Sequence, residues 1–248
     1  MNTLESTATV LGLTALAAGG YLYAGVWPAS QLFGRTLLAG RNPQEIALTF
    51  DDGPNERCTP ELLEILARHE VRATFFMVGK YIRQRPDIAR AVQAAGHLVG
   101  NHTMTHPMLM GCSAKQIREE LRGCKALLED TLGAPVHYFR PPFGARRPYV
   151  LREARSLGLT PVMWNVTGHD WNPCPAEQVQ NTLTQGIARN QQRRRGSNLL
   201  LHDGGHLAMG TDRSHTLRAV DWLLAQDRAG RSFITVDHWN PRNPGNPA

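Results

Sequence analysis

Short apolar runs rich in β-branched and aromatic residues alternate with longer stretches of helical periodicity along most of this 248-residue chain. The expected strands are 46–50, 73–78, 98–100, 136–139, 160–165, 198–201 and 233–236. The expected helices between them are 60–70, 86–95, 113–132, 148–157, 176–190 and 214–229. This alternation predicts an α/β domain with a parallel sheet and helices outside it. About seven βα units fit a distorted barrel or an open doubly wound sheet.

The helix expected at 113–132 has sequence markers at both ends. Ser113 and Gln116 have the spacing of a capping box, and Gly133 follows as a helix stop. These residues fix where the helix starts and ends more firmly than periodicity alone.

The N-terminal segment differs from the rest of the chain. No charged side chain occurs between residues 6 and 34, and Ala8–Trp27 is about long enough to cross a bilayer. We predict an uncleaved transmembrane anchor, because a cleaved signal peptide usually has a positive n-region and this one holds Glu5 instead. A cleaved signal and a buried core helix are the alternatives. Three aromatic residues suit the membrane–water interface: Tyr21, Tyr23 and Trp27.

The predicted division of the chain has four parts: an anchor or signal segment at 1–34, a linker at 35–44, the α/β domain at 45–240 and a flexible tail at 241–248. We expect the domain to be membrane-anchored and to face the cell envelope or exterior. Orientation stays open, since Arg35 and Arg41 follow the span and the positive-inside rule would keep them cytoplasmic.

The net charge of +6 fits an anionic polymer or surface as partner only weakly, and no nucleic-acid motif accompanies it. No protein partner is evident. The chain has four scattered cysteines without a Cys-x-x-Cys pair, so we expect free thiols, although one disulfide would be compatible with the sequence.

Asp51 and Asp52 stand side by side after the first expected strand. Neighbours on a regular strand point to opposite faces, and two like charges so close cost energy. We expect the strand to stop near Phe50, so that both carboxylates lie on the turn made by Gly53 and Pro54 and face one cavity. Functional groups gather at strand ends in parallel α/β folds, and a bound cation would offset the repulsion.

His102 and His106 follow the third expected strand at i, i+4 spacing, which predicts one face of a helical turn. With one aspartate they would form a two-His, one-carboxylate metal site that leaves a position open for water. The other aspartate would then take the water's proton. Zinc is the first expectation, cobalt or nickel fit the same ligands, and an iron oxygenase is an alternative use of this set.

Chemical groups also follow other expected strands. Arg140 could pair with a catalytic carboxylate, and His202 could protonate a leaving group. Asp170 could orient His202, and Trp171 could form one wall of a sugar site. The structural alternatives are an ordinary ion pair, a hydrogen-bonded histidine at a strand end, and core packing.

These motifs together resemble the polysaccharide deacetylases of carbohydrate esterase family 4, the NodB-homology group. The resemblance rests on TFDDGP at 49–54, HTMTH at 102–106, RPPFG at 140–144 and LHD at 201–203, and it spans roughly residues 43–240. It implies a distorted (β/α) barrel and metal-dependent removal of N- or O-acetyl groups from polysaccharides, without an organic cofactor.

The resemblance also implies residue roles. The metal ligands would be Asp52, His102 and His106. The base would be Asp51, held by Arg140, and the acid would be His202, tuned by Asp170. The substrate side would include the backbone N–H of Phe143 as oxyanion donor, Leu201 in the acetyl pocket and Trp171.

One motif departs from the family pattern. Thr167 stands where the family often has aspartate, and His169 is an added imidazole without an assigned role. We expect an N-acetylglucosamine deacetylase acting on peptidoglycan or a chitin-like oligomer. The alternative is a catalytically weak or inactive carbohydrate-binding homologue, which Thr167 alone favours.

Overall fold

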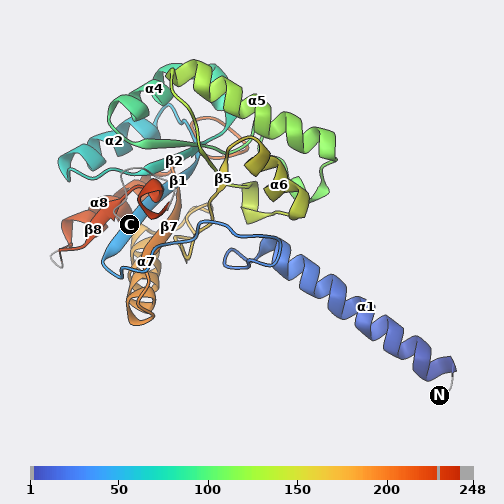
Figure 1. Ribbon diagram of the computed structural model, residues 1–248. Coiled ribbons are helices and arrows are strands. Elements are labelled where there is room, and N and C mark those ends of the chain that lie inside the picture. The colour runs from blue at the N-terminus through green and yellow to red at the C-terminus, as the bar shows by residue number, and fades with distance from the viewer. Residues whose placement is uncertain (1–2, 228–229, 241–248) are drawn as a thin grey trace.

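The computed structural model describes residues 3–227 and 230–240, without the side chains of residues 3–13 and 17. Its parallel strands curl into a half-barrel, in the order β5-β4-β3-β2-β1-β7-β6, with β8 also paired to β1 (Figure 1). The strands are β1 (Glu45–Gly53), β2 (Thr74–Met77), β3 (Leu98–Asn101), β4 (Tyr138–Phe139), β5 (Thr160–Pro161), β6 (Val166–Thr167), β7 (Ser197–His202) and β8 (Ser232–Ile234).

Helices connect the strands and cover the sheet (Figure 1). They are α1 (Thr3–Val26), α2 (Cys58–Arg68), α3 (Gly79–Gln84), α4 (Pro86–Ala94), α5 (Ala114–Leu132), α6 (Pro148–Ser156), α7 (Ala176–Gln192) and α8 (Ser214–Ala225). Three short 3-10 turns add η1 (Leu109–Gly111), η2 (Pro142–Gly144) and η3 (Val236–Trp239). The predicted capping box is confirmed: Ser113 and Gln116 cap α5 reciprocally, and Gly133 ends it in a left-handed conformation with φ 63°.

The predicted parallel sheet is confirmed, and its central strand explains why the fold is stable. Every residue of β1 after Glu45 is buried, because helices cover one face of the strand and the half-barrel interior covers the other. A single large apolar cluster joins the sheet to the helices, and Phe50 and Phe75 meet in it with ring centroids 5.2 Å apart. All four cysteines are free thiols.

The strand predicted at 160–165 is wrong in its extent. Only its first two residues form a strand, β5, which pairs with β4, and the next strand, β6, begins at Val166 and pairs with β7 at the opposite edge of the sheet. Between them the Met163 carbonyl accepts hydrogen bonds from Arg140 and Asn198 instead of joining a ladder. This apolar run therefore crosses from one edge to the other, which periodicity cannot distinguish from one continuous strand.

The end of α1 is tied to the domain, although the helix extends away from it (Figure 1). Arg146 is buried, and its guanidinium donates to the carbonyls of Trp27, Ser30 and Gly144 at 2.8, 2.7 and 3.0 Å. Its backbone N–H donates to the Gly25 carbonyl at 2.9 Å. Residues 24–30 are therefore packed against the domain.

The predicted membrane span, Ala8–Trp27, begins inside α1 and ends one residue after it. The side chains of residues 8–13 and 17 lie outside the part of the chain that the structure describes. Among the residues that the structure describes, no helix is long and apolar enough to cross a membrane. The segment predicted as a linker runs along the sheet edge, where Leu37 bridges to Val162. The predicted tail, 241–248, lies outside the described residues.

Candidate active site

A β-bulge turns Asp51 and Asp52 toward the same cavity. The prediction that the strand stops near Phe50 is wrong, because β1 continues to Gly53. Asp51 pairs with Phe76 and Gly53 with Met77, so Asp52 is the extra residue of the bulge, with φ 72°. The bulge breaks the alternation of side chains within the strand. Both carboxylates therefore line one cavity, each less than 5% exposed.

Asp52, His102 and His106 form the predicted cluster of metal-ligand types, with all three ligand atoms within 4.8 Å of one another. Asp52 Oδ1 lies 3.5 Å from His102 Nε2 and 3.1 Å from His106 Nε2. The prediction that the histidines lie on a helical turn is wrong. They lie on a loop after β3 in which Thr103 and His106 have left-handed backbone, with φ 69° and 64°.

The residues of this cluster fit a divalent cation. Asp52 Oδ1 is buried and has no hydrogen-bond partner among the described residues, although two imidazole nitrogens lie beside it. His102 Nδ1 lies 2.8 Å from the Arg140 carbonyl, which leaves Nε2 to face Asp52. A carboxylate oxygen and two imidazoles converging in this way are a donor set suited to zinc and related ions.

Protonation states in the cluster favour metal binding as well. Burial alone would raise the pKa of Asp52, but His102, His106 and His206 hold it well below its usual range. Burial lowers the pKa of His106, opposed by the Asp52 carboxylate. An ionised carboxylate beside a neutral imidazole is the state in which both groups can act as ligands.

Asp51 is paired with Arg140, as predicted. Arg140 Nη1 donates to Asp51 Oδ1 at 2.8 Å and to Thr49 Oγ1 at 2.6 Å. The guanidinium is fully buried and lies over the Phe76 ring, 4.2 Å from its centroid. The other oxygen of Asp51 lies 3.7 Å from His102 Nε2. Arg140 thus orients Asp51 and compensates its charge, while the free oxygen faces the ligand cluster.

His202 ends β7 and is paired with Asp170, as predicted. Its Nδ1 lies 2.9 Å from Asp170 Oδ1, and its backbone N–H donates to Asp170 Oδ2 at 2.8 Å. Thr216 Oγ1 also donates to Asp170 Oδ2, at 2.8 Å. Burial alone would lower the pKa of His202, but the charge and hydrogen bond of Asp170 raise it to about 9. His202 is therefore an imidazolium at neutral pH and can give a proton.

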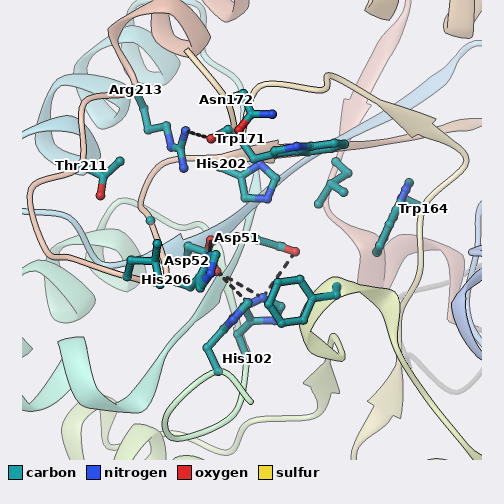
Figure 2. Close-up of a pocket in the computed structure, with 15 residues that line it drawn as sticks. Asp51, Asp52, His102, Trp164, Trp171, Asn172, His202, His206, Thr211 and Arg213 are labelled. Carbon is teal, nitrogen blue, oxygen red and sulfur yellow. Dashed lines mark hydrogen bonds and ion pairs between the residues drawn. The ribbon is translucent and has the colours of Figure 1, made fainter. Parts of the chain in front are cut away.

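These groups face a cavity of about 510 Å³ (Figure 2). Its apolar walls are Phe143, Trp164, Trp171, Leu200 and Leu207. The backbone of Phe143 is left-handed, with φ 59° inside the η2 turn. Trp171 is 44% exposed, and exposed His169 lies edge-on to it at 5.1 Å between ring centroids.

The prediction that Leu201 lines the pocket is wrong. Side chains alternate along β7, so Leu201 points away from His202 and packs in the large core cluster. Leu200 shares the face of His202 and lines the cavity instead.

Sequence reasoning missed His206, and it gave no role to Asp203 of the LHD motif. The His206 ring stacks on His106 with centroids 4.6 Å apart, and its Nδ1 lies 3.8 Å from Asp52 Oδ2. It lies on the loop between β7 and α8, and no ligand spacing connects it to the other histidines. Asp203 is buried and accepts a hydrogen bond from Thr59 Oγ1, and burial raises the pKa of Asp203 to about 7. Its place in the LHD motif, next to His202, was the sequence signal that could have indicated it.

Comparisons with known proteins agree with this geometry. The family described as polysaccharide deacetylase matches residues 39–162. A chitooligosaccharide deacetylase of Rhizobium leguminosarum bv. trifolii is 38% identical over 167 residues, which cover 67% of this chain and 74% of the relative. A peptidoglycan-N-acetylglucosamine deacetylase of Bacillus cereus is 32% identical over 198 residues, covering 79% of this chain and 87% of the relative.

Solved structures give the same fold. The crystal structure of a peptidoglycan N-acetylglucosamine deacetylase superposes with a TM-score of 0.73 at 29% identity, covering 82% of this chain and 91% of that one. A pseudoenzyme of carbohydrate esterase family 4 from Bacillus anthracis also has a TM-score of 0.73, at 25% identity, covering 83% of this chain and 68% of that one.

Proposed function

The chain belongs to the polysaccharide deacetylase family, the NodB-homology group of carbohydrate esterase family 4, and from this premise we propose that it hydrolyses N-acetyl groups on N-acetylglucosamine units of a polysaccharide. Two kinds of relative support this substrate class. Some are chitooligosaccharide deacetylases and others are peptidoglycan-N-acetylglucosamine deacetylases. Both polymers present the same acetamido sugar, so we propose that unit as the target.

The observation that carries the proposal is that a base, a metal-ligand cluster and an acid line one cavity. Asp51 is oriented by Arg140 on one side, and His202 is oriented by Asp170 on the other. In Figure 2, Asp51 and Asp52 lie below His202, with His102 on their far side, and His106 belongs to the same ligand cluster as Asp52 and His102. Amide hydrolysis needs a proton taken from water and a proton given to the departing amine, and this arrangement supplies both.

In the proposed mechanism, a divalent metal held by Asp52, His102 and His106 would polarise the acetyl carbonyl and lower the pKa of a water. Asp51, held by Arg140, takes the proton of the attacking water. The backbone N–H of Phe143 donates to the oxygen that gains negative charge. His202, protonated beside Asp170, then gives its proton to the sugar amine as acetate leaves.

The walls of the cavity suit a sugar ring. Trp171 and Phe143 are both about half exposed and border the same space. Aromatic faces provide flat apolar surface against which a sugar can pack. Leu200 lies beside His202 and would contact the acetyl methyl group.

Acetate release is the test. The full chain is incubated with N-acetylated chitooligosaccharides and, separately, with peptidoglycan, after chelation and again after zinc or cobalt is added. Acetate that appears only with metal would support the proposal and identify the polymer. If neither substrate yields acetate while metal is bound, the proposal fails for N-acetylglucosamine.

A second candidate is a carbohydrate-binding homologue without turnover. It is favoured by Thr167, which replaces an aspartate common in the family, and by the similarity to a solved pseudoenzyme. Sugar binding at the cavity without acetate release would support it. The complete base, ligand and acid sets described above favour catalysis.

We also propose that the N-terminal segment attaches the chain to a membrane, with the domain facing the cell envelope. The support is the uncharged sequence between residues 6 and 34. Fractionation of cells expressing the full chain tests this, and recovery in the cytosolic fraction would contradict it.

A further inference from the structure

We propose that His206 is a positioning residue of the metal site, which holds the second oxygen of Asp52 so that the first oxygen faces the metal. This inference rests on the metal-dependent function proposed above. It concerns a histidine outside the set that the sequence motifs identify.

The two oxygens of Asp52 have different surroundings. Oδ1 lies beside the Nε2 atoms of His102 and His106. Oδ2 lies 3.8 Å from His206 Nδ1, which is longer than a hydrogen bond but within the distance range of an ion pair. A carboxylate that binds a metal through one oxygen is oriented by a donor on the other oxygen, and such partners strengthen metal binding. His206 occupies the place of that donor.

Ring packing fixes the His206 side chain in this place. The ring is stacked on the His106 ring, with an interplanar angle of 22°. It also lies edge-on to Phe143, with centroids 5.3 Å apart. His206 is therefore packed against both the His106 ring and the Phe143 ring of the η2 turn.

The loop that carries His206 is held at three consecutive carbonyls. Arg213 Nε donates to the Gly204 carbonyl at 2.7 Å, Tyr81 Oη to the Gly205 carbonyl at 2.8 Å, and Lys80 Nζ to the His206 carbonyl at 2.6 Å. Lys80 and Tyr81 belong to α3, whereas Arg213 is the residue before α8. The position of the ring is thus set by contacts from separate elements.

Glycine at position 204 permits the close approach of this loop to the bulge. A Cβ atom there would lie 2.1 Å from the Asp52 carbonyl oxygen, which no side chain can tolerate. The backbone of the loop is therefore fitted to the metal-ligand residue itself.

We assign His206 to Oδ2 rather than to the metal. The cluster whose ligand atoms all lie within 4.8 Å of one another contains Asp52, His102 and His106 only, among the described residues. A fourth protein ligand would also occupy the position that a catalytic site keeps open.

Metal affinity tests the proposal, with two variants that separate the functions of the imidazole. His206→Phe keeps an aromatic ring against His106 but removes the N–H donor. His206→Asn removes the ring but places an amide N–H near the position of Nδ1. Zinc and cobalt affinities of the full chain are measured by competition with a chromophoric chelator. Exposed His137, remote from the cavity, supplies the control variant His137→Phe.

We expect His206→Phe to bind metal about 10- to 100-fold more weakly than the unmodified chain. His206→Asn should retain most of the affinity, and His137→Phe all of it. Unchanged affinity in His206→Phe would overturn the proposal, and so would equal losses in the Phe and Asn variants, which would show that only packing matters.

Two further outcomes separate this inference from the function on which it rests. A cobalt absorption spectrum that loses a nitrogen ligand in His206→Asn would make His206 a direct ligand and overturn the assignment. If the unmodified chain binds neither metal, the metal-dependent function itself fails.

Discussion

At the scale of single residues, the two adjacent aspartates differ because of one backbone feature. The bulge at Asp52 places Asp51 beside Arg140 and Asp52 beside two histidines, although the carboxylates are neighbours in sequence. One carboxylate is compensated by a fixed cation and is available for proton transfer. The other carboxylate, Asp52, has an oxygen without a hydrogen-bond partner among the described residues, and this oxygen can bind a metal.

Substitution of each aspartate by asparagine should separate these roles. Asp51→Asn should keep metal affinity but lower kcat by about 10²- to 10⁴-fold, because the group that takes the proton is lost. Asp52→Asn should lose both metal binding and activity. Metal content and acetate release are measured on the same samples, with exposed Asp130→Asn as the matched control. A normal rate in Asp51→Asn would show that another group is the base.

The pair of His202 and Asp170 predicts how activity depends on pH. Since the pKa of His202 is raised to about 9, the acid form is lost, and kcat falls, as pH rises through about 9. Asp170→Asn removes the charge that raises this pKa, so the alkaline limb should move down by about 1–2 pH units. The stability contributed by the pair has the same sign: it is complete below the ordinary histidine pKa of 6.5 and is lost through about 9.

Rates of acetate release across pH 6–10 check this prediction, with Asp130→Asn again as control. An alkaline limb that stays in place in Asp170→Asn would contradict it. Loss of the alkaline limb only after His202 itself is replaced would point to a different orienting group.

Sequence patterns predicted most site residues because they lie at or soon after the carboxyl end of a strand, where parallel folds gather functional groups. The structure brings together every predicted side chain except Leu201. A shift of one residue along a strand moves each side chain to the opposite face of the sheet, so the face that Leu201 occupies was difficult to predict. His206 could not be predicted, because its place beside Asp52 depends on tertiary contacts from α3 and Arg213. The bulge at Asp52 likewise has no marker in the sequence around it.

At the scale of elements, the end of α1 is joined to the η2 turn through Arg146. This buried cation has backbone carbonyls as its acceptors, from residues 27–30 on one side and Gly144 on the other. Phe143 stands next to Gly144, so the turn that carries the proposed oxyanion donor is braced by the segment before residue 31.

Removal of this contact should destabilise the domain. Arg146→Met leaves several buried carbonyls without donors, and we expect a loss on the order of 2 kcal/mol in the free energy of unfolding. Arg146→Lys should lose less, since an ammonium can reach some of these acceptors. Urea denaturation measures the difference, with exposed Arg90→Met as control. Equal stability of Arg146→Met and the unmodified chain would contradict the brace.

Elements with strong periodicity or end markers were predictable, and short ones were not. α5 was found from its capping box and terminal glycine. α3 has only six residues, too few to establish a helical period. The early end of the strand predicted at 160–165 depends on the sheet edges that β5 and the following β6 meet, which is a tertiary property.

At the scale of the whole molecule, the parallel sheet assembles the site from segments far apart in the chain. Asp51 and Asp52 lie on β1, the histidine loop follows β3, and His202 ends β7. A metal bound by Asp52 and the two histidines would connect β1 to the loop after β3. Loss of this metal should therefore lower the stability of the domain as well as its activity.

Chelation should lower the midpoint of thermal unfolding, and zinc or cobalt should restore it. Metal at 100 times its dissociation constant contributes about 2.7 kcal/mol to the free energy of unfolding. Scanning calorimetry with and without chelator measures the shift, and Asp52→Asn should show none. A similar shift in Asp52→Asn would mean that the metal binds elsewhere.

The position of β1 in the sheet also affects how the protein loses activity when it is heated. Nearly its whole length is paired, with β7 along one edge and with β8 and then β2 along the other, and Asp52 is the unpaired bulge residue. Amide protons of such a strand exchange with deuterium only when the entire domain opens. Asp51 and Asp52, the proposed base and metal ligand, lie on this strand. Activity should therefore persist until the domain unfolds as a unit, rather than fade earlier through local fraying of the site.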